Sequence, residues 1–174
     1  MSPVTDARTQ RFAALYEDSY GAIHAYASRR AGWEAADEIA AETFLVAWRK
    51  FDALPAEPLP WLYGVARNLV LRHHADRGRQ RQARAALEGE RRWSPLGAGD
   101  GGDPRLWEAW EQLSAADREV LALVAWEQLS VADAACALGC SAPVFSVRLY
   151  RARRRLERLL AASGASSMLE LAET

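Results

Sequence analysis

Two serine-led sequences and one glycine divide the C-terminal half of the chain into helical segments of fixed order. Residues 114–117 (SAAD) and 130–133 (SVAD) both have the form of a capping box, which opens a helix. Gly139 follows the short second segment, where a left-handed residue commonly ends a helix. Ser141 then precedes a long basic segment. A short helix, a glycine turn and a capped basic helix are typical of a helix-turn-helix.

The basic segment, residues 142 to about 160, is the expected second helix of this motif. Such a helix reads base edges with its N-terminal half, while flanking cations bind phosphates. The residues expected to face the core are Val144, Leu149, Ala152 and Leu156. The residues expected near the groove are Ser146, Val147, Tyr150 and Arg151, with Ser146, Tyr150 and Arg151 on one face. The residues expected near the DNA backbone are Arg148, Arg153, Arg154 and Arg155. A merely solvated basic helix would explain the charge but not the preceding caps and turn.

The N-terminal half is also helical, because apolar residues recur with helical spacing and no strand-like alternation persists. One face is predicted within residues 12–27, and a second helix within residues 34–51. Three prolines in residues 52–60 forbid a continuing helix and predict a stiff loop. A third helix is expected to begin near Trp61. The buried face of the second helix is predicted to contain Ile39, Thr43, Phe44, Ala47, Trp48 and Phe51.

The composition changes to Gly, Ser, Pro and Asp at residues 89–104, which predicts a flexible linker. The expected fold is therefore all-α, with two small helical domains. We expect the first domain at residues 8–88 and a helix-turn-helix domain at residues 105–162. Residues 163–174 are predicted to form a short tail, which packs back on the last helix or frays.

The net charge of −1 conceals two strongly basic stretches. Residues 61–93 contain eight arginines and three acids, and residues 141–160 contain six arginines and one acid. Each stretch therefore carries about five excess positive charges, whereas the rest of the chain is acidic. Two separate basic patches indicate two contacts with a polyanion.

The sequence offers no catalytic constellation, so the protein is not expected to be an enzyme. It contains no Ser/His/Asp set, no Gly-rich phosphate loop and no convergent pair of carboxylates. Cys136 and Cys140 make a metal site conceivable, but no third ligand lies nearby, and two small buried residues are the preferred interpretation. No metal or cofactor is expected. Without a long apolar run or a signal peptide, a cytoplasmic location is expected.

The chain is similar to bacterial RNA polymerase sigma factors of the sigma-70 family, extracytoplasmic-function type. Residues 114–158, SAADREVLALVAWEQLSVADAACALGCSAPVFSVRLYRARRRLER, resemble region 4 of that family, which recognises the −35 promoter element. Residues 12–50, with DEIAAETFLVAWRK at their end, resemble regions 2.1 and 2.2. Residues 60–81, PWLYGVARNLVLRHHADRGRQR, resemble regions 2.3 and 2.4. The motifs stand in the family's order, and the predicted linker falls where the family has one.

The resemblance implies three partners. The second helix would dock on a coiled coil of the polymerase β′ subunit, and the C-terminal domain on the β flap. The acidic residues that would contact the coiled coil are Asp37, Glu38 and Glu42. Without the resemblance, a merely solvated acidic face is the preferred interpretation of these residues. Ala41 departs from the family, which often has Gln there, so one polar contact is in doubt. Promoter DNA is the second partner. The family usually also has an anti-sigma factor, whose existence here stays open.

The third helix and its preceding loop would act at the −10 element by the same resemblance. The loop 52–60 would form a pocket for a flipped base, and Asn68 would help to position that base. A cationic track along the strand would consist of Arg67, Arg72, Arg77 and Arg79. Trp61 and Tyr63 offer rings for stacking, but their helical spacing is more typical of core residues, and a core position is favoured for Trp61.

Two other classes of protein remain as alternatives. A conventional helix-turn-helix regulator with an N-terminal helical sensor or interaction domain would share the C-terminal half. It would bind duplex DNA without a polymerase, and it would not need the arginine-rich third helix or the proline loop. A helical adaptor protein fits less well, because it would have no use for a helix-turn-helix.

Overall fold

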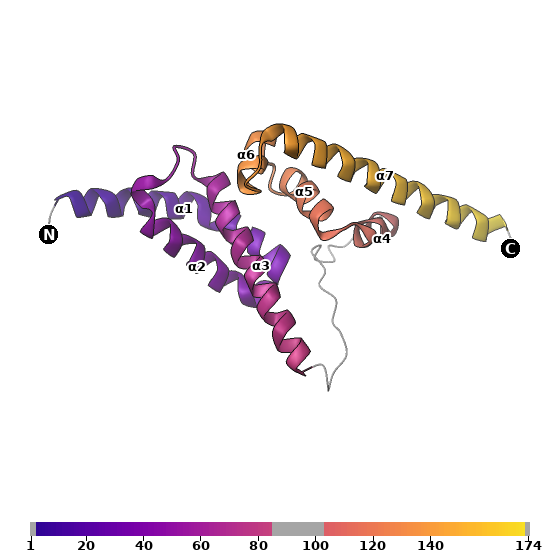
Figure 1. The fold of residues 1–174 in the computed structure, drawn as a ribbon, viewed down its shortest axis with the longest axis horizontal. Helices are drawn as coiled ribbons and strands as arrows, with labels where there is room; N and C mark the ends of the chain where they lie inside the picture. The colour runs from indigo at the N-terminus through magenta and orange to yellow at the C-terminus, as the bar shows by residue number, and fades with distance from the viewer. Residues whose placement is uncertain (1–2, 85–102, 173–174) are drawn as a thin grey trace. The chain divides into compact units, whose positions relative to one another are not determined.

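The computed structural model describes the backbone of residues 3–84 and 103–172, and the side chains of residues 7–79 and 103–162. The chain divides into two compact units, residues 1–97 and 98–174. Both units are helical throughout their described elements (Figure 1). Most of the predicted linker, residues 89–102, lies outside the described residues. Its expected last residue, Pro104, instead begins a helix.

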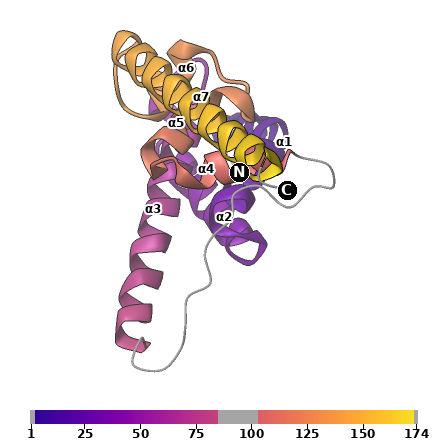
Figure 2. The same cartoon turned by 90° about the vertical axis from the view of Figure 1, so that its right-hand side faces the viewer.

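The first unit is a bundle of three helices. They are α1 (Pro3–Ala31), α2 (Trp33–Arg49) and α3 (Leu59–Arg84), with a 3-10 turn at Phe51–Ala53. Each helix packs on the other two, and the C-terminal half of α3 extends past α1 and α2 (Figures 1 and 2). The bundle core includes Ile23, Tyr26, Ala27, Ile39, Phe44, Leu62, Ala66 and Leu69.

One glycine makes the sharp return from α1 to α2. Gly32 is the single residue between the two helices, and its φ is +86°, a conformation that side chains rarely adopt. Its amide donates to the carbonyl of Ser28 (3.0 Å), and its own carbonyl accepts from the amide of Ala35 (3.3 Å). The turn thus brings α2 back along α1, so that their apolar faces close on each other.

The connection between α2 and α3 differs from the predicted one at both ends. Helix α2 ends at Arg49, and Phe51 is buried within the 3-10 turn rather than within the helix. Helix α3 begins at Leu59 rather than near Trp61, because Pro60 lies in its first turn, where no backbone donor is needed. The predicted loop 52–60 is therefore shorter on both sides.

The second unit contains α4 (Pro104–Gln112), α5 (Ala115–Ala125), α6 (Val131–Ala137) and α7 (Ala142–Ala172). The two predicted capping boxes are confirmed. The Ser114 hydroxyl oxygen accepts from the amide of Asp117 (3.1 Å), and the Ser130 hydroxyl oxygen accepts from the amide of Asp133 (3.1 Å). These bonds fix the first turns of α5 and α6.

The glycine turn between α6 and α7 is confirmed as well. Gly139 has a φ of +62° and donates to the carbonyl of Cys136 (3.0 Å). The amide of Cys140 donates to the carbonyl of Ala135 (2.9 Å), which completes a Schellman motif. The turn sets α6 and α7 at a bend of 99°. Cys136, which was expected to be buried, is exposed on this short helix.

Helix α7 packs against the other three helices of the second unit. Its buried residues are Phe145, Leu149 and Ala152, which are four and three residues apart, while Leu156 is half-buried. The prediction that Val144 faces the core is therefore wrong: its side chain is 44% exposed, and the neighbouring Phe145 is fully buried. Two adjacent apolar residues compete at this point, and the larger aromatic side chain fills the core.

The last helix is longer than predicted. It was expected to end near Leu160, yet the backbone stays helical to Ala172. Residues 161–172 contain no proline, and their Ala, Leu, Met and Glu residues favour a helix. Most of the predicted tail, residues 163–172, thus has helical backbone.

No single described helix is both long and apolar enough to cross a membrane. By length and composition alone, α6 and the first part of α7 meet that criterion only together, as a bent pair.

Candidate DNA and polymerase interfaces

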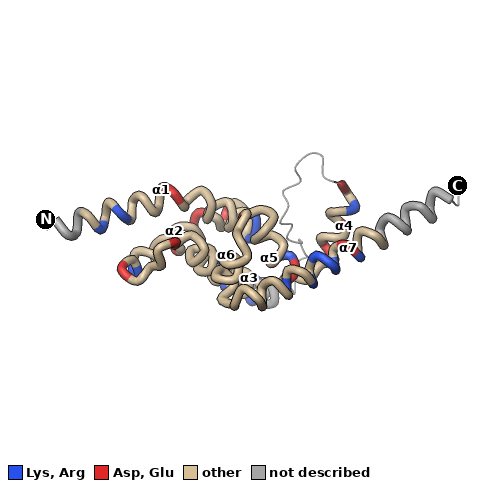
Figure 3. Tube along the Cα trace, turned by 90° about the horizontal axis from the view of Figure 1, so that it is seen from above, with Lys and Arg blue, Asp and Glu red and all other residues tan. Residues whose placement is uncertain are grey.

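The side of α7 that faces away from its core is exposed and cationic. Helical geometry turns each residue by about 100°, so the residues opposite Phe145, Leu149 and Ala152 form one outward stripe. That stripe consists of Val147, Tyr150, Arg151 and Arg154, all of which are exposed. Figure 3 shows basic residues following one another along the middle of α7.

Not all predicted groove residues share that stripe. Ser146 lies on one edge and donates its hydroxyl to the carbonyl of Ala142 (3.0 Å). Arg151 follows five residues later, which places it about 140° further around the helix. The expectation that Ser146 and Arg151 share a face with Tyr150 is therefore wrong: Tyr150 lies between them. Arg151 instead follows Val147 by one turn.

The arginines of α7 differ in what they already contact. Arg148, Arg151 and Arg153 make no ion pair with any described side chain. Arg154 donates to Glu157 (3.1 Å), and this hydrogen bond, aided by the nearby Tyr150, raises the pKa of the Arg154 guanidinium. Three of the arginines predicted to contact DNA thus form no ion pair with a described side chain, whereas Arg154 is paired with Glu157.

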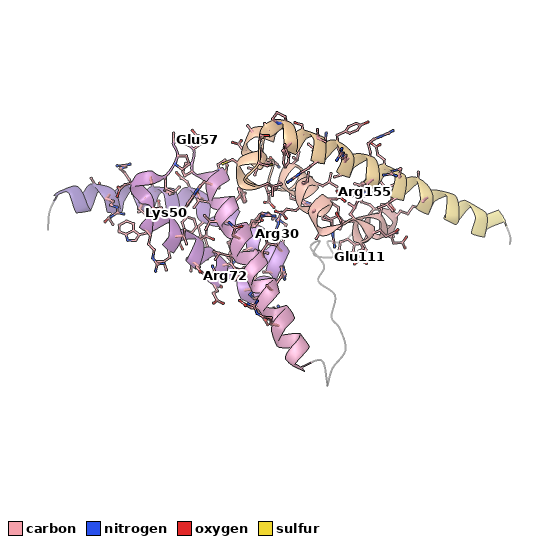
Figure 4. The ribbon with its side chains drawn as sticks, viewed as in Figure 1. Arg30, Lys50, Glu57, Arg72, Glu111 and Arg155 are labelled. Carbon is pink, nitrogen blue, oxygen red and sulfur yellow. The ribbon has the colours of Figure 1, made fainter. Side chains whose placement is uncertain are left out.

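Arg155 is bound within the protein. Its guanidinium pairs with the carboxylate of Asp117 on α5, and Figure 4 labels Arg155 on α7. Asp117 is 13% exposed, and its Oδ2 also accepts from the Ser114 hydroxyl (2.6 Å). Arg155 thereby joins the middle of α7 to the first turn of α5. Its predicted role as a phosphate contact stays a prediction.

The exposed side of α3 brings together part of the predicted −10 set. Trp61, Asn68, Arg72 and Arg79 are seven, four and seven residues apart, which places them on one side of a helix. Asn68 and Arg72 are exposed, and Trp61 is half-buried rather than in the core. Arg79 pairs with Asp76 one turn earlier.

Two other arginines of that set lie elsewhere. Arg67 is adjacent to Asn68 in sequence and therefore about 100° away around the helix. Arg77 lines a hollow of about 250 Å³ together with Glu34, Glu38, His73 and Asp76. Tyr63, considered for base stacking, is 3% exposed and packs on the Tyr26 ring (5.3 Å). Trp61 is therefore the better placed of the two aromatic rings.

The acidic face of α2 is partly committed to contacts within the first unit. The Glu42 carboxylate pairs with the Arg72 guanidinium (3.1 Å), a residue labelled in Figure 4. Asp37 accepts from the Tyr20 hydroxyl (3.2 Å) and lies 3.1 Å from the Nε2 of His24. Burial, together with Asp37, raises the pKa of Tyr20. Glu38 is exposed and forms no ion pair with any described residue.

Sequence reasoning missed Trp33, the first residue of α2. Its side chain is 72% exposed, and its ring meets His24 edge-to-face at 4.9 Å. Because tryptophan is enriched at protein interfaces, Trp33 is a further candidate for the polymerase interface on this helix. The place of Trp33 in the sequence could have indicated this role, because Trp33 directly follows Gly32 and comes just before the acidic residues of α2.

Comparisons with known proteins identify the same family for both units. The family model described as Sigma-70 region 2 matches residues 15–80, and the one described as Sigma-70, region 4 matches residues 104–156. Over 141 residues the chain is 30% identical to "RNA polymerase sigma factor NccH" of Alcaligenes xylosoxydans xylosoxydans, covering 73% of this chain and 74% of that protein. The chain belongs to the sigma-70 family of RNA polymerase sigma factors.

Solved structures place this sigma factor with the extracytoplasmic-function type. It resembles the sigma factor RpoE of Bartonella quintana, solved with the anti-sigma factor NepR (TM-score 0.66, 27% identity, 87% of this chain and 98% of that one). It also resembles CnrH, solved with the cytosolic domain of CnrY (TM-score 0.59, 27% identity, 91% and 94%). Sigma factors are initiation factors and not enzymes, so the family agrees with the prediction of no enzymatic activity.

Proposed function

We propose that this sigma factor binds core RNA polymerase through α2 and directs initiation at promoters whose −35 element is read by α7 and whose −10 element is opened at α3. One observation carries the proposal most directly. The outward side of α7 presents Val147, Tyr150 and Arg151 without any acid before Glu157, and α7 is the second helix of a helix-turn-helix whose first helix, α6, has its predicted cap. A basic helix so presented fits a major groove.

The side of α3 with Trp61, Asn68 and Arg72 supports a role with single-stranded DNA. Capture of an unstacked base needs an aromatic surface, a polar group for the base edge and cations along the strand. Trp61 and Asn68 supply the first two from one helix side. Arg72, on the same side, supplies the cation when it exchanges Glu42 for a phosphate. Arg79 extends the same side and exchanges Asp76 for a phosphate when the strand binds.

Docking on the polymerase is supported by the side of α2 that carries Trp33 and Glu38. Glu38 has no ion pair within the described residues, so a basic partner surface meets an unoccupied carboxylate. Trp33 adds a large apolar contact beside it. The β′ coiled coil is the proposed partner of this side, and the β flap that of the second unit. Such a factor acts in the cytoplasm.

An anti-sigma factor is the third proposed partner. One relative of similar fold, RpoE, was solved with the anti-sigma factor NepR, and another, CnrH, was solved with the cytosolic domain of CnrY. Because an inhibitor of initiation must deny access to polymerase or DNA, we expect it to cover α2 or α7.

The test compares DNA retention with and without core polymerase. Genomic fragments are incubated with the full chain alone, with core enzyme alone and with both, and the retained fragments are sequenced. The proposal predicts that specific fragments are retained only when both are present. Equal retention by the chain alone would identify a conventional helix-turn-helix regulator instead.

A further inference from the structure

Two valines stand exposed at the start of α7, where a helix-turn-helix approaches base edges. Val144 is 44% exposed and Val147 is 50% exposed, although the residues between and after them, Phe145 and Leu149, are buried. Residues three apart lie side by side on a helix surface, so the two valines form one apolar ridge across the first two turns. The ridge does not belong to the core of the unit.

The surroundings of the ridge define what it contacts. Arg148 follows Val144 by one turn, and Arg151 follows Val147 by one turn. Both arginines are exposed and form no ion pair with a described side chain, and the first acid on the helix is Glu157. An apolar ridge bordered by free guanidinium groups suits a surface that is mostly anionic with isolated apolar groups. A protein partner with an apolar groove would leave these cations without counter-charges.

Exposed valine is also an unfavourable choice for a helix unless it makes a contact. A β-branched side chain loses rotamer freedom against the preceding turn, and alanine, glutamate or lysine would stabilise an exposed helix better. The rest of α7 follows that rule, since its other exposed positions up to Arg158 are mainly arginine. The two valines and Tyr150 are the exposed apolar departures, and all three lie in the half proposed to enter the groove.

In the major groove only thymine offers an apolar group, the C5-methyl, while the other bases present donors and acceptors or bare ring carbon. We propose that Val144 and Val147 read thymine methyl groups of the −35 element, so that the factor prefers thymine at one or two positions without any hydrogen bond to it. This inference rests on the proposed function of α7. It assigns a base-reading role to Val144, which sequence periodicity had placed in the core.

The test removes single methyl groups from the DNA. A −35 element is first selected with holoenzyme assembled from core polymerase and the full chain. Each thymine in it, on either strand, is then replaced by deoxyuridine, which lacks only the C5-methyl. At one or two positions we expect binding to weaken about three- to fivefold, the effect of losing one buried methyl group.

Protein variants identify the side chains that sense the methyl. With Val147→Ala or Val144→Ala, the preference for thymine over deoxyuridine should fall at the corresponding position, because the two γ-methyl groups that would reach the thymine methyl are removed. Val131→Ala is the matched control: Val131 is also exposed, at 38%, but it lies on α6, so sensitivity to the methyl should persist.

The possible results distinguish a failure of methyl reading from a failure of the proposed function. A selected element that binds equally well with every thymine replaced would overturn methyl reading while leaving recognition by α7 intact. Persistent methyl sensitivity in both valine variants would overturn the assignment in the same way. Failure of the holoenzyme to select any −35 element would overturn the proposed function, and the inference with it.

Discussion

Arg155 on α7 forms an ion pair with Asp117 on α5, at the same carboxylate oxygen that accepts a hydrogen bond from the Ser114 hydroxyl. The cap of one helix is thereby linked to the middle of the helix proposed to read DNA. Consequently, the two neighbouring arginines Arg154 and Arg155 have different roles, although the sequence makes them look equivalent. Arg154 points outward with Glu157, and Arg155 positions α7 against α5.

Arg155→Ala should lower the stability of the second unit, by about 1 kcal/mol or less because Arg155 is partly exposed and solvent screens the pair. Thermal unfolding followed by circular dichroism measures the change. Arg154→Ala is the matched control and should leave the unfolding midpoint unaltered. In a double-mutant cycle with Asp117→Asn, additive effects of the two substitutions would show that the pair does not couple the helices.

Glu38→Arg should weaken assembly with core polymerase several-fold or more, since it places like charges against a basic partner surface. Co-purification or fluorescence anisotropy with labelled sigma factor measures the affinity. Glu57→Arg is the control, an exposed acid in the loop between α2 and α3 that is labelled in Figure 4. Glu42→Arg is a less clean variant because it also removes the Arg72 pair. Undiminished assembly by Glu38→Arg would refute docking through this side.

Asn68→Ala should spare binding to the −35 element and impair strand opening, because the proposed partner of Asn68 is an unstacked base. The loss of one such hydrogen bond corresponds to about 1.4 kcal/mol, or roughly tenfold in the open fraction. Permanganate reactivity of the −10 thymines measures opening, and exchange of loop residues 54–58 with those of a relative should shift the preferred −10 sequence. Unaltered footprints in both variants would assign α3 another role.

Arg151→Ala should change the ranking of −35 sequences, since loss of a bidentate contact to guanine costs about 1–3 kcal/mol at a single base. Arg153→Ala should weaken all sequences alike and reduce the salt dependence by about one ion, because its proposed partner is a phosphate. Binding-site selection with each holoenzyme at two salt concentrations distinguishes them. The same ranking for Arg151→Ala and the parent would contradict the assignment.

Local signals in the sequence were sufficient for the helix-turn-helix. Ser114, Ser130 and Gly139 each act through hydrogen bonds within a few residues, so their roles are legible without the fold. The order of the helices and the two-unit division followed from the same signals and from the resemblance. The side of α7 that faces the core could not be predicted in this way. Val144 and Phe145 are adjacent, and helical periodicity alone allows either of them to be the buried residue.

Contacts between distant residues were beyond sequence reasoning. The Arg155–Asp117 pair joins positions 38 residues apart, and the Arg72–Glu42 pair joins positions 30 residues apart. Both depend on how helices pack, which no short pattern encodes. Each pair also involves residues that were predicted to bind other molecules. Glu42 was predicted to contact polymerase and its partner Arg72 to contact DNA. Arg155 was predicted to contact DNA, and its partner Asp117 belongs to the capping box of α5. Burial and pairing therefore decide which of many similar charges are free to bind.

In vitro transcription measures whether the chain directs core polymerase to specific promoters. Core polymerase, with and without the full chain, transcribes a genomic fragment library, and the 5′ ends of the products are sequenced. We expect discrete start sites that depend on the chain and share two upstream motifs. The upstream motif should lose its thymine preference with Val147→Ala, and the downstream motif should govern opening through Asn68. Start sites that are the same with and without the chain would contradict the proposed function.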